Sequence, residues 1–331
     1  MFILESYQIA VVFCIITMLC WGSWANTQKL AGKTWRFELF YWDYVIGVLV
    51  MALIFAFTLG SSGEAGRGFV EDLAQAGAKN LGSAFLGGVI FNAANILLVA
   101  AIAVAGMSVA FPVGIGIALV LGVVVNYMAQ PKGDPMVLFV GVALIVAAII
   151  LDALAYRRLP NQGKGGAKGL ILAVLCGILM GCFYRFVAAS MSADFVQMEA
   201  GKLSPYTAMV CFSLGIVASN FLFNTILMRK PVSGEPVPPG EYFKGTIRDH
   251  LWGSVGGMIW AVGMTFSIIA FGIAGPAISY GLGQGATLVA AFWGVFIWRE
   301  FREAPSGTNV FLALMFLGYV VGLSMIIWSG A

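Results

Sequence analysis

The stretch from Gly87 to Gln130 reads GGVIFNAANILLVAAIAVAGMSVAFPVGIGIALVLGVVVNYMAQ, and it returns in altered form later in the chain. Residues 256–299, which read GGMIWAVGMTFSIIAFGIAGPAISYGLGQGATLVAAFWGVFIWR, align with it without a gap. About ten of about 44 positions are identical at a fixed offset of about 169 residues, roughly half the chain. Glycine-interrupted apolar segments that recur in two halves are typical of secondary transporters.

The composition indicates an integral membrane protein. Of the 331 residues, 60% are hydrophobic and only 10% are charged, whereas a soluble domain carries about 45–50% apolar and about 25% charged residues. The five cysteines all fall within apolar runs, so they indicate neither a disulfide framework nor a metal site. The single histidine, His250, lies at the edge of an apolar run, which favours an interfacial residue over a proton relay. We expect no cofactor.

About ten apolar runs are long enough, at about 20 residues each, to cross a bilayer as helices. They cover roughly residues 8–29, 37–60, 82–105, 107–129, 135–156, 169–190, 205–228, 252–274, 276–298 and 308–329. Five spans per half is an odd number, so the second half enters the membrane from the opposite side. The sequence therefore predicts an all-α membrane fold of two inverted five-helix repeats, residues 1–157 and 169–331, joined by a cytoplasmic linker at 158–168.

The basic residues predict the orientation. The loops after the first, fifth, seventh and ninth runs hold 13 Lys and Arg residues, and the opposite loops hold 4. The positive-inside rule places the basic loops in the cytoplasm and both termini outside it. We expect a multi-pass protein of the inner (plasma) membrane, a monomer or a homodimer, with the lipid bilayer, protons and a small solute as partners and no nucleic acid.

Polar and aromatic residues within the spans mark the predicted binding site, because lipid cannot satisfy a polar side chain. Trp21 and Trp24 share one face of the first span, where they form either a stacking wall for a flat solute or an interfacial aromatic belt. Asn92 and Asn95 are three residues apart, and their amides suit either a polar solute or bonding between helices. Trp260, in the aligned region, offers an aromatic surface opposite the amides.

Two further positions in the second half are unusual. Arg185 is the one basic residue well inside a span, so it pairs with a carboxylate such as Asp152 or Asp43, binds a substrate oxygen, or snorkels to the interface. Gln284 stands where the aligned position has Ile115, and small-residue packing does not explain this amide. The predicted substrate contacts are Trp24, Asn92, Asn95, Arg185, Trp260, Tyr280 and Gln284.

Two carboxylates near the start of the second span are candidates for proton coupling. Asp43 lies deeper and is flanked by aromatic residues, and a charged carboxylate is costly there, which makes it the first choice as a proton carrier. Glu38 lies nearer the interface and is the second choice. The alternative for Asp43 is a structural pair with a cation such as Lys29.

Short segments along nearly the whole chain match one known family in order and spacing. They are Gly22-Ser23-Trp24, similar to the family's Gly-Thr-Trp, then Asp43-Tyr44, Ala56-Phe57-Thr58-Leu59-Gly60, Gly87-Gly88, Asn95, Asn126-Tyr127, Tyr206-Thr207-Ala208, and Phe292-Trp293-Gly294 followed by Glu300. On these segments the chain resembles the ureide permease family of the drug/metabolite transporter superfamily. The resemblance implies a ten-helix inverted-repeat carrier for proton-linked import of compounds such as allantoin, uracil or xanthine. The long central loop of plant members is short here, as in a bacterial relative.

The sequence thus predicts a secondary active transporter that imports a small, polar, ring-shaped solute by alternating access with proton coupling. The alternative is a monosaccharide transporter of the same superfamily, for glucose, ribose or rhamnose. A drug exporter needs a larger apolar pocket, and a channel needs a continuous polar stripe that no span carries. An enzyme needs a nucleophile and base or a metal cluster, and the chain has almost no histidine for either.

Overall fold

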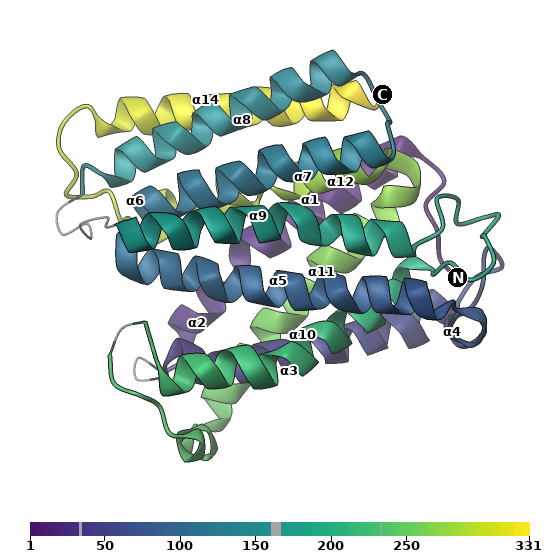
Figure 1. Ribbon diagram of the computed structural model, residues 1–331. Coiled ribbons are helices and arrows are strands. Elements are labelled where there is room, and N and C mark those ends of the chain that lie inside the picture. Colours follow the sequence, from purple (N-terminus) through teal and green to yellow (C-terminus); the bar gives the residue numbers. More distant parts are fainter. Residues whose placement is uncertain (33–34, 160–166, 233) are drawn as a thin grey trace.

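The computed structural model describes residues 1–32, 35–159, 167–232 and 234–331, which form a bundle of long helices (Figure 1). Within these ranges nine helices are long and apolar enough to cross a membrane, and α1 (Tyr7–Ser23) is apolar but shorter. The short helix α2 (Asn26–Leu30) follows α1 almost directly and extends it. The prediction of an all-α, ten-span membrane protein is confirmed.

The spans fall close to the predicted boundaries. Seven of them are single helices: α3 (Phe37–Phe57), α5 (Ala78–Ala105), α8 (Pro135–Tyr156), α9 (Ala167–Ser190), α10 (Pro205–Arg229), α11 (Ile247–Ala274) and α14 (Thr308–Ser329). The fourth span joins α6 (Met107–Ala110), the π-helical η2 (Phe111–Ile115) and α7 (Gly116–Ala129). The ninth joins α12 (Pro276–Gly283), α13 (Ala286–Phe292) and the π-helical η4 (Trp293–Ile297). The connections hold η1 (Leu59–Ser61), α4 (Phe69–Gln75) and η3 (Pro239–Lys244).

Local sequence explains where several helices begin. Asp134 and Ser204 each precede a proline at the first helical position, and their side chains accept hydrogen bonds from the backbone N–H three residues on. Thr246 and Asp249 form a reciprocal capping box at the start of α11. These caps satisfy backbone N–H groups that would otherwise lack partners at the membrane surface.

The first helix of the repeated sequence and the joint after it fold the same way in both copies. Helices α5 and α11 are both 28 residues long, and each begins and ends at the aligned positions. Each ends at a glycine with positive φ, 77° at Gly106 and 80° at Gly275, and the next span starts at the following residue. A side chain is strained in this conformation, so both joints depend on glycine.

Packing between helices repeats in the same way. Helix α5 packs against α10, and α11 packs against α3. A Cβ atom added at Gly88 of α5 would overlap the carbonyl group of Phe212, and one added at the aligned Gly257 of α11 would overlap that of Tyr44. Small residues allow this close approach of helices in membranes. The pairs α5–α10 and α3–α11 are therefore built on one pattern.

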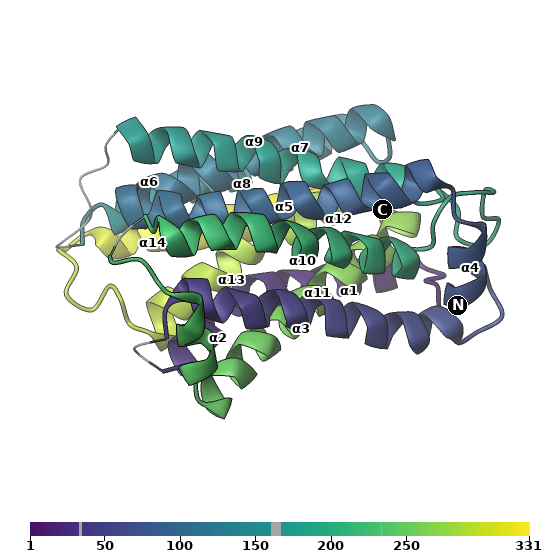
Figure 2. The same cartoon turned by 60° about the horizontal axis from the view of Figure 1, so that its bottom comes forward.

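The bundle has two distinct ends. Both termini lie at the end of the bundle that also holds α4, and α2 lies at the other end (Figures 1 and 2). The basic residues near α2, Lys29 and Arg36, are bonded to Glu300 and to the segment before η3. Helices α8 and α14 form a tight pair along one edge of the bundle, away from α3 and α10 (Figure 1). The predicted linker, 158–168, lies mostly outside the described residues, and the division of the chain at this linker stays a prediction.

Candidate functional site

A cavity of about 430 Å³ lies between helices of both halves. Small-molecule sites occupy about 300–1,000 Å³, so its size fits a solute. Gln28 in α2, Phe37 at the start of α3 and Ala103 near the end of α5 all line it. These positions lie toward the basic end of the bundle, so the cavity extends to that end. We call it the main cavity.

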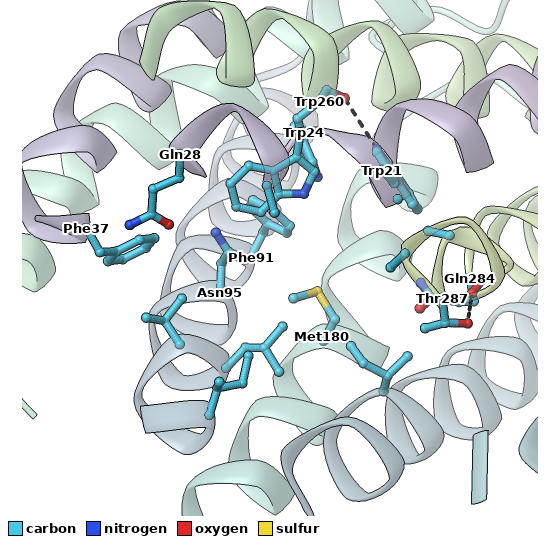
Figure 3. Close-up of a pocket in the computed structure, with 18 of the residues that line it drawn as sticks. Trp21, Trp24, Gln28, Phe37, Phe91, Asn95, Met180, Trp260, Gln284 and Thr287 are labelled. Atoms are coloured by element: carbon cyan, nitrogen blue, oxygen red, sulfur yellow. Dashed lines mark hydrogen bonds between the residues drawn. The ribbon is translucent and has the colours of Figure 1, made fainter. Parts of the chain in front are cut away.

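One wall of the main cavity is aromatic (Figure 3). The rings of Trp21 and Trp260 are stacked with their centroids 5.8 Å apart and an angle of 10° between their planes. Phe91 also packs on Trp260, with ring centroids 4.3 Å apart, and Trp24 packs on Tyr44, with ring centroids 4.7 Å apart. The indole N–H of Trp21 donates to the Trp260 carbonyl at 3.3 Å. Held in this way, the wall presents flat surfaces on which a ring can stack.

A few polar side chains interrupt the apolar lining. Asn95 donates to the Tyr41 hydroxyl at 3.0 Å, which holds its amide in place. The side-chain amides of Gln28 and Gln284 have no hydrogen-bond partner among the residues that the structure describes, although both line the cavity and Gln284 is buried. An amide that faces a cavity without a protein partner can both donate a hydrogen bond to a polar ligand and accept one from it.

The break between α12 and α13 positions Gln284. Helix α12 ends at Gly283 and α13 begins at Ala286, so Gln284 lies in a turn instead of on a continuous helix face. Thr287, which also lines the cavity, donates to the Gln284 carbonyl at 3.0 Å (Figure 3). The turn directs the glutamine toward the cavity from the second half of the molecule.

The end of the first span is tied to the end of the ninth. Trp293 donates to the Ser23 hydroxyl at 2.9 Å, and Trp298 donates to the Asn26 side chain at 2.6 Å. One turn further on, Lys29 pairs with Glu300 at 3.2 Å. These contacts join two of the matching segments, the one around Ser23 and the one around Trp293. They also leave Trp24 free to face the cavity.

Four of the predicted substrate contacts line the main cavity: Trp24, Asn95, Trp260 and Gln284. Asn92 does not. It is fully buried, accepts from the Tyr41 hydroxyl at 2.8 Å and donates to Ser219 at 2.9 Å, as the alternative of bonding between helices describes. Tyr280 is also fully buried, with its hydroxyl 3.1 Å from the Ala118 carbonyl and 3.0 Å from that of Met180.

Arg185 lies in a different place. It lines a separate cavity of about 200 Å³ at the end of the bundle that holds the termini. Neither Asp152 nor Asp43 pairs with it, and no hydrogen bond or ion pair of its side chain occurs within the described part of the chain. Of the three alternatives for Arg185, this leaves the contact with a substrate oxygen and snorkelling to the interface.

The Asp43 carboxylate has two partners on other elements. It is 3% exposed, accepts a hydrogen bond from Tyr242 of η3, and lies 3.0 Å from Nδ1 of His250 of α11. The alternative pairing with Lys29 is wrong, because Lys29 pairs with Glu300. The interpretation of His250 as merely interfacial misses its contact with Asp43. Burial and the neighbouring carboxylate raise the pKa of Tyr242, so its hydroxyl stays protonated as the donor.

Glu38, the second carboxylate candidate, forms a fork with the Arg36 guanidinium, at 2.5 Å and 3.2 Å. Its charge is therefore compensated. Across the described ranges, no group of three His, Cys, Asp or Glu side chains gathers closely enough to hold a metal ion.

Sequence reasoning missed Gln28, Phe91 and Thr287 as lining residues. For Phe91 a signal existed, since it aligns with Trp260 in the repeat. For Gln28 the signal was weak, because the residue lies at the end of an apolar run among other polar residues. Thr287 follows Gln284 by three positions and lies in the first turn of α13.

Comparisons with known proteins agree on one family. The profile of the family described as Ureide permease matches residues 40–164 and 155–329. Ureide permease 1 of Arabidopsis thaliana is 22% identical over 99% of this chain and 99% of its own length. Probable ureide permease A3 of Vigna unguiculata is 29% identical over 93% of this chain and 100% of its own length.

A crystal structure of a protein superposes with a TM-score of 0.61 over 96% of both chains at 14% identity, which supports the fold. The family match extends over both halves of the chain, from residue 40 to residue 329. On this evidence the chain belongs to the ureide permease family, and it is a multi-pass membrane transporter rather than an enzyme.

Proposed function

We propose that this protein imports a ureide or nucleobase, such as allantoin, uracil or xanthine, across the plasma membrane by alternating access. The observation that carries the proposal is the pairing of unsatisfied amides, Gln28 and Gln284, with stacked indoles in one cavity. A planar ring with N–H and C=O groups on its edge needs a flat surface for its face and amides for its edge. The names of the relatives agree with this class of solute.

The closed end of the bundle supports alternating access. Arg67 donates to the fully buried Asp72 at 3.0 Å and to the Lys202 carbonyl at 2.7 Å, and Asp72 accepts from the Ser204 N–H at 2.7 Å. These bonds join the connection before α5 to the connection before α10, so they hold the two halves together at this end. With the basic end in the cytoplasm, the main cavity is open to the cytoplasm and closed to the outside.

We assign proton coupling to Asp43, with Glu38 as the second candidate. Asp43 is nearly buried and lies one residue before Tyr44, whose ring packs on Trp24 of the main cavity. A change of charge at Asp43 alters its bonds to Tyr242 and His250 and thereby the position of α3 against α11. Glu38 is less suitable because Arg36 already neutralises it.

A ligand screen by thermal stability tests the solute assignment. We expect allantoin or a nucleobase to raise the Tm of purified wild-type protein, since a ligand that binds only the folded form stabilises it by mass action. Gln284→Ala should abolish this shift while leaving the Tm without ligand nearly unchanged. Gln197→Ala, a change at an exposed loop glutamine, is the matched control and should respond like the wild type.

The second candidate function is transport of a monosaccharide, because indole faces also stack on sugar rings. A sugar presents hydroxyl groups around its whole ring and needs many polar partners, whereas the lining of the main cavity is mostly apolar. Stabilisation by ribose, glucose or rhamnose, with none by allantoin, uracil or xanthine, would favour this function and reject the first.

A further inference from the structure

We propose that the cavity around Arg185 is a second solute site, an outer vestibule that binds the carbonyl groups of the solute before it reaches the main cavity. The proposal rests on the proposed function, because it takes the same solute class. It assigns Arg185 a role outside the main cavity, as a contact at the opposite end of one transport path.

The vestibule is built from both halves and is polar. Asn126 and Gln130 come from α7 and the residue after it, Arg185 from α9, and Glu199 and Lys202 from the connection between α9 and α10. Its lining thus carries two cationic side chains, two amides and one carboxylate. Such a set disfavours cations and suits a solute rich in carbonyl oxygens.

Two of these residues have side-chain polar atoms without a hydrogen-bond partner among the described residues. The planar guanidinium of Arg185 is partly exposed and offers several N–H donors, none of which is used within the described residues. Asn126 is fully buried; its amide N–H donates to the Gly122 carbonyl at 2.8 Å, and its Oδ1 has no partner in the described part of the chain. A solute with both C=O and N–H groups on its edge would satisfy both residues, which a simple anion would not.

Two tyrosines separate the vestibule from the main cavity. Along α9, Met180 and Phe183 line the main cavity and Arg185 lines the vestibule, with Tyr184 between them. Tyr184 and Tyr280 are fully buried with ring centroids 5.4 Å apart. The ninth span shows the same order.

Along the ninth span, Pro276 lines the vestibule and Gln284 lines the main cavity, with Tyr280 midway between them in sequence. The Tyr280 hydroxyl donates to the Ala118 carbonyl of α7 at 3.1 Å, so this tyrosine of the second half is bonded to the first half. Along both spans, Tyr184 and Tyr280 therefore lie between the residues that line the vestibule and those that line the main cavity.

The repeat gives an independent argument. Ile102, near the end of α5, lines the open end of the main cavity, and the aligned residue near the end of α11, Phe271, lines the vestibule. In an inverted-repeat carrier the halves exchange conformations when access alternates. The vestibule at the closed end thus corresponds to the mouth of the main cavity at the open end. In the alternate conformation, the vestibule opens to the outside.

Uptake kinetics in proteoliposomes test the role of Arg185. Arg185→Gln should raise KM for external allantoin about tenfold and leave kcat within about twofold, because it removes a binding contact and no barrier-crossing step. Lys79→Gln, which removes an exposed cation at the same end, is the control for a general charge effect and should leave KM unchanged. An unchanged KM in Arg185→Gln would overturn the proposal.

A cysteine in the vestibule gives a second readout without changing Arg185. Ala129 lines the vestibule and is exposed, so Ala129→Cys should react with a membrane-impermeant thiol reagent from outside, and allantoin should slow the reaction several-fold. Ser62→Cys, exposed at the same end but outside the cavity, should react without protection.

The two proposals fail in different ways. If allantoin and the nucleobases neither shift the Tm of the wild type nor protect Ala129→Cys, the proposed function itself is rejected, and the vestibule proposal with it. If the Gln284-dependent Tm shift persists while Ala129→Cys is not protected, the solute assignment stands and the vestibule proposal alone is overturned.

Discussion

Phe91 and Trp260 occupy the same position in the two copies of the repeat, as do Ile115 and Gln284, and all four side chains line the main cavity. The first copy contributes the apolar member of the second pair, and the second copy contributes the amide. Phe91 and Trp260 lie on helices α5 and α11, which have equal lengths and end at matching glycine joints. Ile115 ends the π-helical η2, whereas Gln284 lies in the turn between α12 and α13. The backbones of α5 and α11 are therefore symmetric, while the backbone at Gln284 and the side-chain chemistry of the cavity are not.

This difference separates two kinds of constraint. The positions that keep the symmetry, such as the joints at Gly106 and Gly275, serve the backbone and the packing of helices. The positions that depart from the symmetry carry a polar residue in one copy only. Gln284 is aligned with Ile115, and Asn95 is aligned with Met264, which is fully buried. In an inverted-repeat carrier the solute site lies at the repeat interface, where a solute without symmetry needs such departures.

Restoring the symmetry at Gln284 should have the largest effect. Gln284→Ile introduces the residue of the aligned position and removes the amide, so we expect solute affinity to fall about 100-fold, or about 2.7 kcal/mol. Titration calorimetry with allantoin on purified protein measures this loss. The double variant Ile115→Gln with Gln284→Ile moves the amide to the aligned position and should regain part of the affinity. Full affinity in Gln284→Ile alone would show that the amide does not bind the solute.

Asp43 is a further departure from symmetry, with a moderate expected effect. The α3–α11 contact matches the α5–α10 contact, so α3 corresponds to α10. In this correspondence Tyr44 matches Phe212, and Asp43 matches Cys211. The groups that face Asp43 are Tyr242 of η3 and, on α11, His250 and Asp249. Asparagine keeps the shape and cannot carry a proton.

In Asp43→Asn we expect an inward proton gradient to lose its effect on uptake, so that solute accumulation falls about tenfold below that of the wild type. The rate of solute exchange without a gradient should stay within about twofold of the wild-type rate. The sign follows from the carrier role: low external pH loads the wild-type carboxylate and stimulates uptake, and the permanently neutral amide makes uptake independent of external pH. Glu38→Gln is the matched control and should keep the gradient effect. The reverse pattern in the two variants would transfer the role to Glu38.

The sequence predicts the scaffold well because its determinants are local. Apolar length defines each span, and the glycine at each joint is required by the backbone conformation of that residue alone. The site was predicted only in part. Asn92 and Asn95 share a helix face, yet Asn95 reaches the cavity while Asn92 bonds to Tyr41 and Ser219, which are distant in the chain.

Other misses have the same cause. The contact between Asp43 and His250 joins residues 207 positions apart, and no local pattern announces it. Arg185 lies within α9, as its place in an apolar run indicates, but it lines the second cavity and not the main one. Long-range packing decides which of several polar residues on one helix faces a solute.

Trp260→Phe should have the smallest effect and gives the finest test of the comparison. This substitution places phenylalanine at both aligned positions, 91 and 260, and keeps a flat apolar surface at position 260. The smaller ring gives up part of its stacking on Trp21, whose hydrogen bond to the backbone carbonyl of residue 260 is kept. We expect about a threefold loss of affinity, since aromatic pairs contribute about 0.5–1.5 kcal/mol beyond buried area. Phe91→Trp, in the same calorimetric titration, makes the opposite symmetric pair. If both variants bind as tightly as the wild type, the difference between Phe91 and Trp260 is a matter of packing, and the polar departures alone define the solute site.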